Sequence, residues 1–181
     1  TFTNYGTVTA SSGTPTLNGL LINQAGGSLL VNGGTLIVRG AAANENYGTI
    51  TVSSGTLNLA TNNNDLTVFA GGIINQTGGA VTIRNLTINS AAAPLAAGNL
   101  TFSGSTSNIT GDLTNSGTAT LNGGTVNIAG NITNNASGDF TIGGAAVTSQ
   151  NDATNFGIMS VSSGSLDLAT AGKKLIIDGS T

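Results

Sequence analysis

The chain has 181 residues, and 117 of them are Gly, Thr, Asn, Ala or Ser, far above the usual share in globular domains. Charged residues make up only 6%, the net charge is −3, and His, Cys and Trp are absent. Acid–base catalysis, metal ligation and thiol chemistry draw on these scarce or missing types, so the composition argues against most enzyme classes. A hydrophobic share of 38% with so little net charge also argues against a disordered chain.

Internal repeats are the strongest signal in the sequence. The segment from Asn4 to Thr14 recurs from Asn46 to Thr56 and again from Asn155 to Ser165, each with an Asn, a Gly two residues later and a Ser-Ser-Gly turn. Looser copies follow the same pattern and start at Asn23, Asn75, Asn115 and Asn134. Successive starts differ by 19, 23, 29, 40, 19 and 21 residues. These intervals predict a coil of about 20 residues if the interval of 40 spans two coils and those of 23 and 29 contain loop insertions.

Within each repeat, apolar residues alternate with polar ones, which is typical of short, half-buried strands. Helices are excluded by the frequent Gly and by the lack of any apolar stripe at helical spacing. A third strand is predicted before the next Asn, at residues 20–22, 66–69 and 175–177. The inward positions are expected to include the pairs Val8/Ala10, Leu57/Leu59, Val81/Ile83, Ala119/Leu121, Val126/Ile128 and Leu166/Leu168.

A sandwich has no reason to repeat one corner every 20 residues, whereas stacked coils do. The sequence therefore predicts an all-β fold, a parallel β-helix (β-solenoid) of about nine coils with three short strands per coil. Outward Thr, Ser and Asn would form ladders along the stack. Gly and Asn would occupy corners that demand positive φ, with the Asn amide bonding along the stack.

At the level of Asn-Tyr-Gly-Thr-Ile-Thr (46–51) and Ser-Gly-Thr-Leu-Asn-Leu (54–59), the chain resembles the repeat regions of filamentous haemagglutinins and autotransporter passenger domains. This resemblance implies a right-handed β-helix in a secreted bacterial surface protein. It covers nearly the whole chain. The repeats carry no functional residue that could be transferred.

Residues 1–181 are expected to form a single solenoid segment, excised from or continuous with a longer array. The repeat pattern runs to both ends, and the first residues lack the basic start and apolar core of a signal peptide. The sequence contains no run of about 18 apolar residues, so no membrane span is predicted. The basic residues are too few to neutralise a phosphate backbone, so no nucleic-acid partner is expected: Arg39, Arg84, Lys173 and Lys174.

We predict no catalytic, cofactor-binding or metal-binding residue, and no cofactor. The acidic residues are scattered, and the alternative is that Asp139 and Asp152 lie on neighbouring coils. The full set is Glu45, Asp65, Asp112, Asp139, Asp152, Asp167 and Asp178. Tyr5, Tyr47 and Phe156 share one motif position and are predicted to cap the core at a corner rather than to stack on sugars. Lys173 and Lys174 occupy the loop where another copy has Asn64 and Asp65, and are predicted to be solvated.

The leading functional hypothesis is a structural and adhesive rod segment of an exported bacterial cell-surface protein. Its partners would be a cell surface, a glycan or a matrix ligand. The main alternative is an extracellular filament or sheath subunit that self-associates end to end through its end coils. Two lesser alternatives are a polysaccharide-active β-helix enzyme, which needs converging carboxylates, and an ice-binding solenoid. An ice face needs strict Thr-x-Thr pairs, and Ile158 and Ser160 replace the pair found in other copies: Thr7/Thr9, Thr49/Thr51 and Thr118/Thr120.

Overall fold

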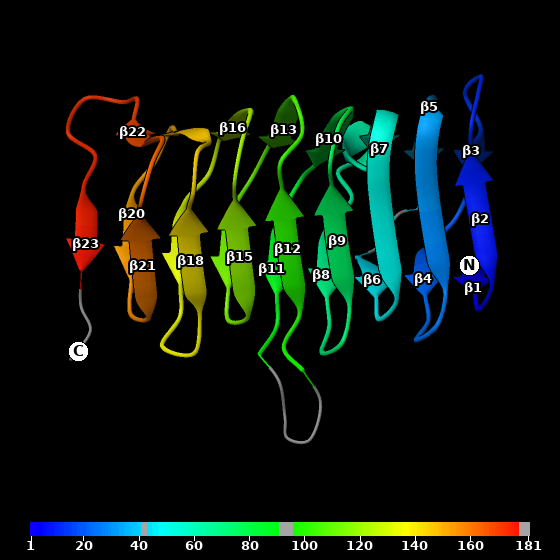
Figure 1. Cartoon of the computed structure of the whole chain (residues 1–181), viewed down its shortest axis with the longest axis horizontal. Helices are drawn as coiled ribbons and strands as arrows, with labels where there is room; N and C mark the ends of the chain where they lie inside the picture. The colour runs from blue at the N-terminus through cyan, green and yellow to red at the C-terminus, as the bar shows by residue number, and fades with distance from the viewer. Residues whose placement is uncertain (41–42, 91–95, 178–181) are drawn as a thin grey trace.

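The structure is a computed structural model that describes residues 1–40, 43–90 and 96–177. It is a parallel β-solenoid in which the chain winds through three faces per coil, and successive coils lie side by side along the long axis (Figure 1). A nine-stranded sheet forms face 1, and a 14-stranded sheet forms faces 2 and 3. The predicted fold class is therefore confirmed. The right-handed sense of winding stays a prediction.

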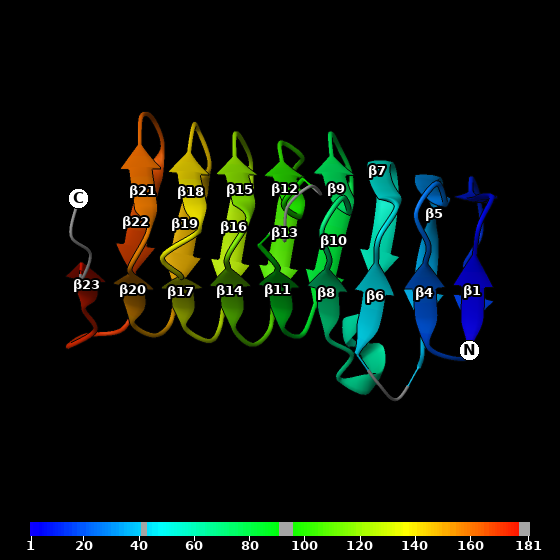
Figure 2. The ribbon, with the colours of Figure 1, turned by 90° about the horizontal axis from the view of Figure 1, so that it is seen from below.

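Face 1 holds one short strand from each coil, seen in a row in Figure 2. Its strands, in stacking order, are β1 (Phe2–Asn4), β4 (Leu21–Asn23), β6 (Asn44–Asn46), β8 (Leu66–Val68), β11 (Leu86–Ile88), β14 (Leu113–Asn115), β17 (Ile132–Asn134), β20 (Ala153–Asn155) and β23 (Leu175–Ile177). The stack amounts to about eight turns, with β23 following the last complete coil, rather than the nine predicted. Nine strands about 4.8 Å apart span about 38 Å.

Faces 2 and 3 are joined because two strands run through the corner between them: β5 (Ser28–Val38) and β7 (Thr49–Asn58). Face 2 also contains β2 (Thr7–Ala10), β9 (Ile73–Gln76), β12 (Asn99–Phe102), β15 (Thr118–Leu121), β18 (Asp139–Ile142) and β21 (Ile158–Val161). Face 3 also contains β3 (Thr16–Leu17), β10 (Ala80–Ile83), β13 (Thr106–Ile109), β16 (Thr125–Ile128), β19 (Ala146–Ser149) and β22 (Ser165–Leu168). The short 3-10 helix η1 (Ala60–Asn62) lies between β7 and β8.

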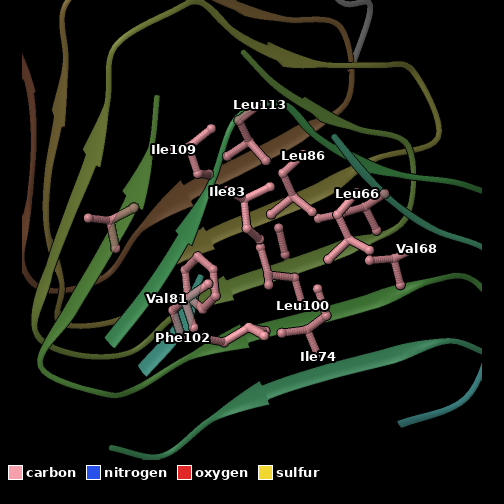
Figure 3. Packing of buried hydrophobic residues seen from close by; sticks show 14 of the residues in the cluster. Leu66, Val68, Ile74, Val81, Ile83, Leu86, Leu100, Phe102, Ile109 and Leu113 are labelled. Atoms are coloured by element: carbon pink, nitrogen blue, oxygen red, sulfur yellow. The ribbon is translucent and has the colours of Figure 1, made fainter. Parts of the chain in front are cut away.

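A single apolar core fills the interior because every strand alternates inward and outward side chains. In Figure 3, Leu66, Leu86 and Leu113 follow one another through three coils of face 1. The predicted inward pairs are confirmed: most are fully buried, and Val8, Leu166 and Leu168 pack partly buried against the core. Apolar side chains stack on apolar side chains because the register pairs equivalent residues of neighbouring coils.

Buried asparagines form two rows inside the solenoid at the end of face 1. Asn4 Nδ2 donates to Asn23 Oδ1 at 2.8 Å, and Asn23 Nδ2 donates to Asn46 Oδ1 at 2.8 Å. The second row repeats this arrangement, from Asn115 to Asn134 at 2.8 Å and from Asn134 to Asn155 at 2.6 Å. In the two intervening coils, the same position holds the buried Val68 and Ile88.

These rows correct two sequence predictions. The asparagines lie in strands and not at positive-φ corners, although their amides do bond along the stack as expected. Asn75, predicted to start a coil, instead faces outward in β9 of face 2, half-buried, paired with Thr51 and Thr101. Asn115 lies three coils after Asn46, as the intervals predicted, but the equivalent residues of the two coils between them are Val68 and Ile88.

The glycine of the Asn-x-Gly motif is required by close packing between coils. A Cβ on Gly48 would collide with the carbonyl oxygen of Gly27, one coil earlier. A Cβ on Gly157 would collide with the carbonyl oxygen of Gly138. Positive φ is instead found in other turns, for example at Gly55 and Gly164 of the Ser-Ser-Gly motif.

The Asn134 side chain should be a strong determinant of stability. Its Nδ2 also donates to the carbonyl oxygens of Gly138 at 3.2 Å and Ile158 at 2.8 Å. Asn134→Ala would remove one hydrogen bond from each of these carbonyls and from the amides of Asn115 and Asn155, and would leave the buried Asn155 Oδ1 without its donor, so we expect a loss of about 2–4 kcal/mol in the free energy of unfolding. Asn127→Ala, at an exposed position on face 3, is the control and should cost less than about 0.5 kcal/mol. Urea denaturation would measure both, and equal losses would contradict a structural role for the internal row.

Candidate functional site

The acidic residues are distributed over different parts of the solenoid. Asp65, Asp112 and Asp152 each precede a strand of face 1, whereas Asp139 and Asp167 lie on faces 2 and 3. Asp139 and Asp152 therefore belong to different faces. Glu45 faces outward in β6, and Asp178 lies outside the described residues. In the described ranges, no group of three or more His, Cys, Asp or Glu side chains is placed to hold a metal ion.

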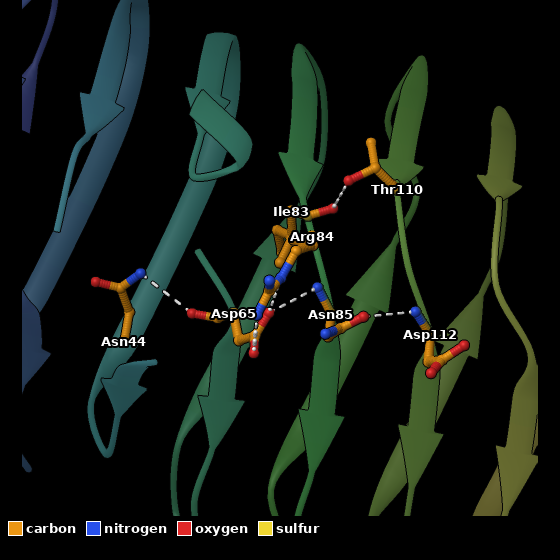
Figure 4. A network of polar contacts seen from close by, with 7 residues as sticks. All are labelled: Asn44, Asp65, Ile83, Arg84, Asn85, Thr110 and Asp112. Atoms are coloured by element: carbon orange, nitrogen blue, oxygen red, sulfur yellow. Dashed lines mark hydrogen bonds and ion pairs between the residues drawn. The ribbon is translucent and has the colours of Figure 1, made fainter. Parts of the chain in front are cut away.

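Asp and Asn side chains form a row along the corner that leads into face 1 (Figure 4). Asn85 Oδ1 accepts from the backbone N–H of Asp112 at 2.8 Å, and Asp112 Oδ1 accepts from that of Asn131 at 2.7 Å. Asp152 Oδ1 accepts in the same way from Lys174 at 3.0 Å. Each side chain thus bonds the backbone of the next coil, which explains why Asp and Asn interchange here.

Asp65 begins this row and also pairs with Arg84 of the next coil. Arg84 Nε lies 2.6 Å from Asp65 Oδ1, and Arg84 Nη2 lies 2.7 Å from Asp65 Oδ2. The hydrogen bond from Arg84 lowers the pKa of Asp65; the positive charge of Arg84 and the N–H of Asn85 act in the same direction, against partial burial. Asp65 and Arg84 lie side by side because they occupy neighbouring coils. They are far apart along the chain, so the sequence alone does not indicate the ion pair.

The aromatic residues do not form a surface that could stack on sugar rings. Tyr5 is 73% exposed and Phe156 is 41% exposed, whereas Tyr47 is half-buried. Tyr47 stacks on Phe69, which follows β8 at the equivalent position, with ring centroids 4.5 Å apart and planes 8° apart. Each ring therefore covers one face of the other. The predicted capping role fits Tyr47 and is wrong for the exposed Tyr5 and Phe156. The alignment of the internal repeats did not place Phe69 at this position.

Burial raises the pKa of the Tyr47 hydroxyl, and the hydrogen bond to Glu45 and its negative charge act in the same direction. The Tyr47 hydroxyl donates to Glu45 Oε2 at 3.2 Å. The stacked pair and this carboxylate close the corner after face 1 over two coils. This contact is a packing feature of the corner.

Threonine occupies the single outward position of face 1 in five consecutive coils. These residues pair directly in the sheet: Thr67, Thr87, Thr114, Thr133 and Thr154. The row ends at Glu45 on one side and at Ile176 on the other. The sequence comparison missed it because a three-residue strand shows no alternation. Face 2 carries two outward rows, but Leu30 and Ile73 interrupt its Thr pairs, so no strict Thr-x-Thr array is present there.

A shallow hollow of about 310 Å³ lies on the outer side of face 3, across several adjacent coils. We refer to it as the face-3 hollow. Its lining includes Thr82, Asn108, Thr110, Asn127, Ala129 and Gln150. The sequence pattern did not predict the hollow, because its shape depends on which side chains lie beside each other in neighbouring coils.

The last coil presents apolar side chains that elsewhere are covered. Val161 is 51% exposed, Leu175 45% and Ile177 70%, although they stack on the buried Ile142, Ala153 and Asn155. Lys174 is exposed and Lys173 half-buried, in partial agreement with the predicted solvation.

Comparisons with protein-family models, curated proteins and solved structures gave no match to this chain. The β-helix repeat architecture is thus supported by the structure itself. Across the described residues, no helix has the length and apolarity needed to cross a membrane.

The Asp65–Arg84 pair should make stability depend on acid pH. Because the folded pKa of Asp65 is depressed, the pair stabilises the fold above the ordinary carboxyl pKa of 3.8, and this is lost as the pH falls through the folded value. Asp65→Asn keeps an acceptor for Asn85 and removes the titration. Between pH 6 and pH 3, the Tm of the wild type should therefore fall further than that of the variant, by about 2 °C or less because the pair is partly exposed.

Asp112→Asn is the matched control, since in the described part of the chain Asp112 forms no ion pair. Its pH profile of Tm should follow that of the wild type. The account of the pair fails if Asp65→Asn and Asp112→Asn give the same profile.

Proposed function

We propose that this chain is a non-catalytic, structural and adhesive rod segment of an exported bacterial cell-surface protein. The observation that carries the proposal is the continuous parallel stacking of coils around one core, with register shifts between β5 and β7 only at Asn32. A stack of this kind gains about 4.8 Å in length with each coil and needs no change in the coils already present. Such a fold suits a protein that must extend a surface away from a cell.

Other features support the export and adhesion parts of the proposal. The repeats resemble those of filamentous haemagglutinins and autotransporter passenger domains, whose architecture is the one seen here. The chain has no Cys, which is compatible with export in an unfolded and unbridged state. The row of threonine hydroxyls on face 1 would be available to polar partners along the rod.

The rod proposal predicts that one whole coil can be removed without unfolding the rest. Deletion of residues 132–152 joins Asn131 to Ala153 and brings Asn115 over Asn155, so the inner Asn row continues. We expect the β-sheet circular dichroism to be retained and the long dimension in small-angle X-ray scattering to shorten by about 4.8 Å.

The matched control deletes residues 132–142, about half a coil, and places inward side chains out of register. This variant should lose cooperative unfolding. The rod proposal would be contradicted if the half-coil variant still unfolded cooperatively, or if the whole-coil variant were unfolded.

The alternative function is a self-assembling filament subunit, in which the first coil of one copy stacks on the last coil of another and covers its apolar side chains. Light scattering and electron microscopy would then show end-to-end rods that grow with concentration. Ile177→Lys, at an inward position, should abolish them, while Ile176→Lys, at the outward neighbour, should not. A monomer at every concentration would exclude this alternative.

A further inference from the structure

The face-3 hollow combines a mostly apolar lining, to which Ile109 and Ile128 also belong, with amide and hydroxyl side chains, which is the chemistry of a binding site for a neutral ligand. Among the residues that the structure describes, no charged side chain lines it. Asn127 Nδ2 donates to Asn108 Oδ1 at 2.9 Å, which orients both amides. Among the described residues, this leaves Asn108 Nδ2 as a donor and Asn127 Oδ1 as an acceptor for an outside molecule.

The far side of the hollow adds a further amide. Gln150 Oε1 accepts from the Thr170 hydroxyl at 3.4 Å, so its Nε2 is directed away from that contact. Thr82 and Thr110 also line the hollow, and the Thr110 hydroxyl donates to the Ile83 carbonyl oxygen at 3.5 Å. Amides and hydroxyls that both donate and accept match a ligand whose own groups are hydroxyls.

The hollow exists because Ala129 is small. The backbone N–H groups of Thr110, Ala129 and Gln150 bond to Ile83, Ile109 and Ile128 in turn, so these three residues occupy one position in successive coils. A methyl group between Thr110 and Gln150 leaves room that a longer side chain would fill.

From this geometry we infer that the face-3 hollow binds a neutral oligosaccharide of one or two sugar rings. Its volume of about 310 Å³ is at the lower end of the range for small-molecule sites. Anionic sugars are disfavoured because Arg84, which precedes Thr110 in the same row, is paired with Asp65. The inference rests on the adhesive part of the proposed function and names the class of ligand and the place where it binds.

Nuclear magnetic resonance titration of the full chain tests this directly. The probes are cellobiose, maltose, lactose and chitobiose, each up to about 10 mM, tenfold above a weak Kd of about 1 mM. At least one should shift the side-chain amide signals of Asn108, Asn127 and Gln150. Glucuronic acid should not shift them.

Ala129→Trp should fill the hollow and weaken the Kd at least tenfold. Ala146→Trp is the control, because it places the same side chain at an exposed position on face 3 outside the hollow. Asn127→Ala provides a second variant, with a threefold or greater loss expected from removal of one acceptor.

The outcomes separate the hollow from the wider proposal. Binding that Ala129→Trp does not weaken, or shifts confined to other surfaces, would overturn the face-3 site and leave adhesion standing. Shifts by glucuronic acid equal to those of the neutral sugars would overturn the assignment of a neutral ligand. No shift with any probe would overturn the face-3 site, and adhesion would then rest on other surfaces of the rod, while the coil-deletion experiment tests the rod separately.

Discussion

The residue-for-residue pairing of each coil with the next is the constraint on which the structure depends. Because parallel strands stack in register, an inward residue meets an inward residue, so a polar group inside can take the equivalent residue of the next coil as a partner. Asn134 does so through Asn115 and Asn155. Where Val68 and Ile88 occupy that position, apolar contact replaces the amide row. The interior therefore tolerates either solution in consecutive coils. A single buried amide also occurs, at Gln76 between Val52 and Phe102. It bonds to the carbonyl oxygens of Gly79 and Thr106 and to the Ser107 hydroxyl.

The same constraint explains where the molecule can vary. Equivalent positions are 19 residues apart between Leu113 and Ile132 but 27 apart between Leu86 and Leu113, and both pairs remain in register. Extra residues are accommodated in corners such as that of η1, between β7 and β8. Outward side chains are free to differ from coil to coil. A small residue such as Ala129 between longer neighbours then produces a recess, so binding surfaces can arise without any change in the core.

The sequence predicts the fold well because period-two alternation and a repeated corner leave little choice of architecture. It also aligns Asn4 with Asn23 and Asn115 with Asn134 correctly. The sequence prediction fails at Asn75, because the sequence does not show whether an Asn side chain faces inward or outward. The inner position of that coil is occupied by Val68, so no Asn marks it. The Asp65–Arg84 pair and the Tyr47–Phe69 stack were missed because both lie across these central coils. The face-3 hollow depends on side-chain sizes in adjacent coils, which requires the register to be known.

The central claim is the register itself, and engineered disulfides measure it most directly because the chain has no native Cys. Thr114 and Thr133 are direct partners on the outside of face 1, whereas Thr87 and Thr133 are two coils apart. Their Cα separations are about 4.8 Å and about 9.6 Å, within and beyond the reach of a disulfide. On oxidation, the double variant Thr114→Cys/Thr133→Cys should form an intramolecular disulfide, and Thr87→Cys/Thr133→Cys should not. Cross-linking of the second pair without the first would contradict the stacked-coil account.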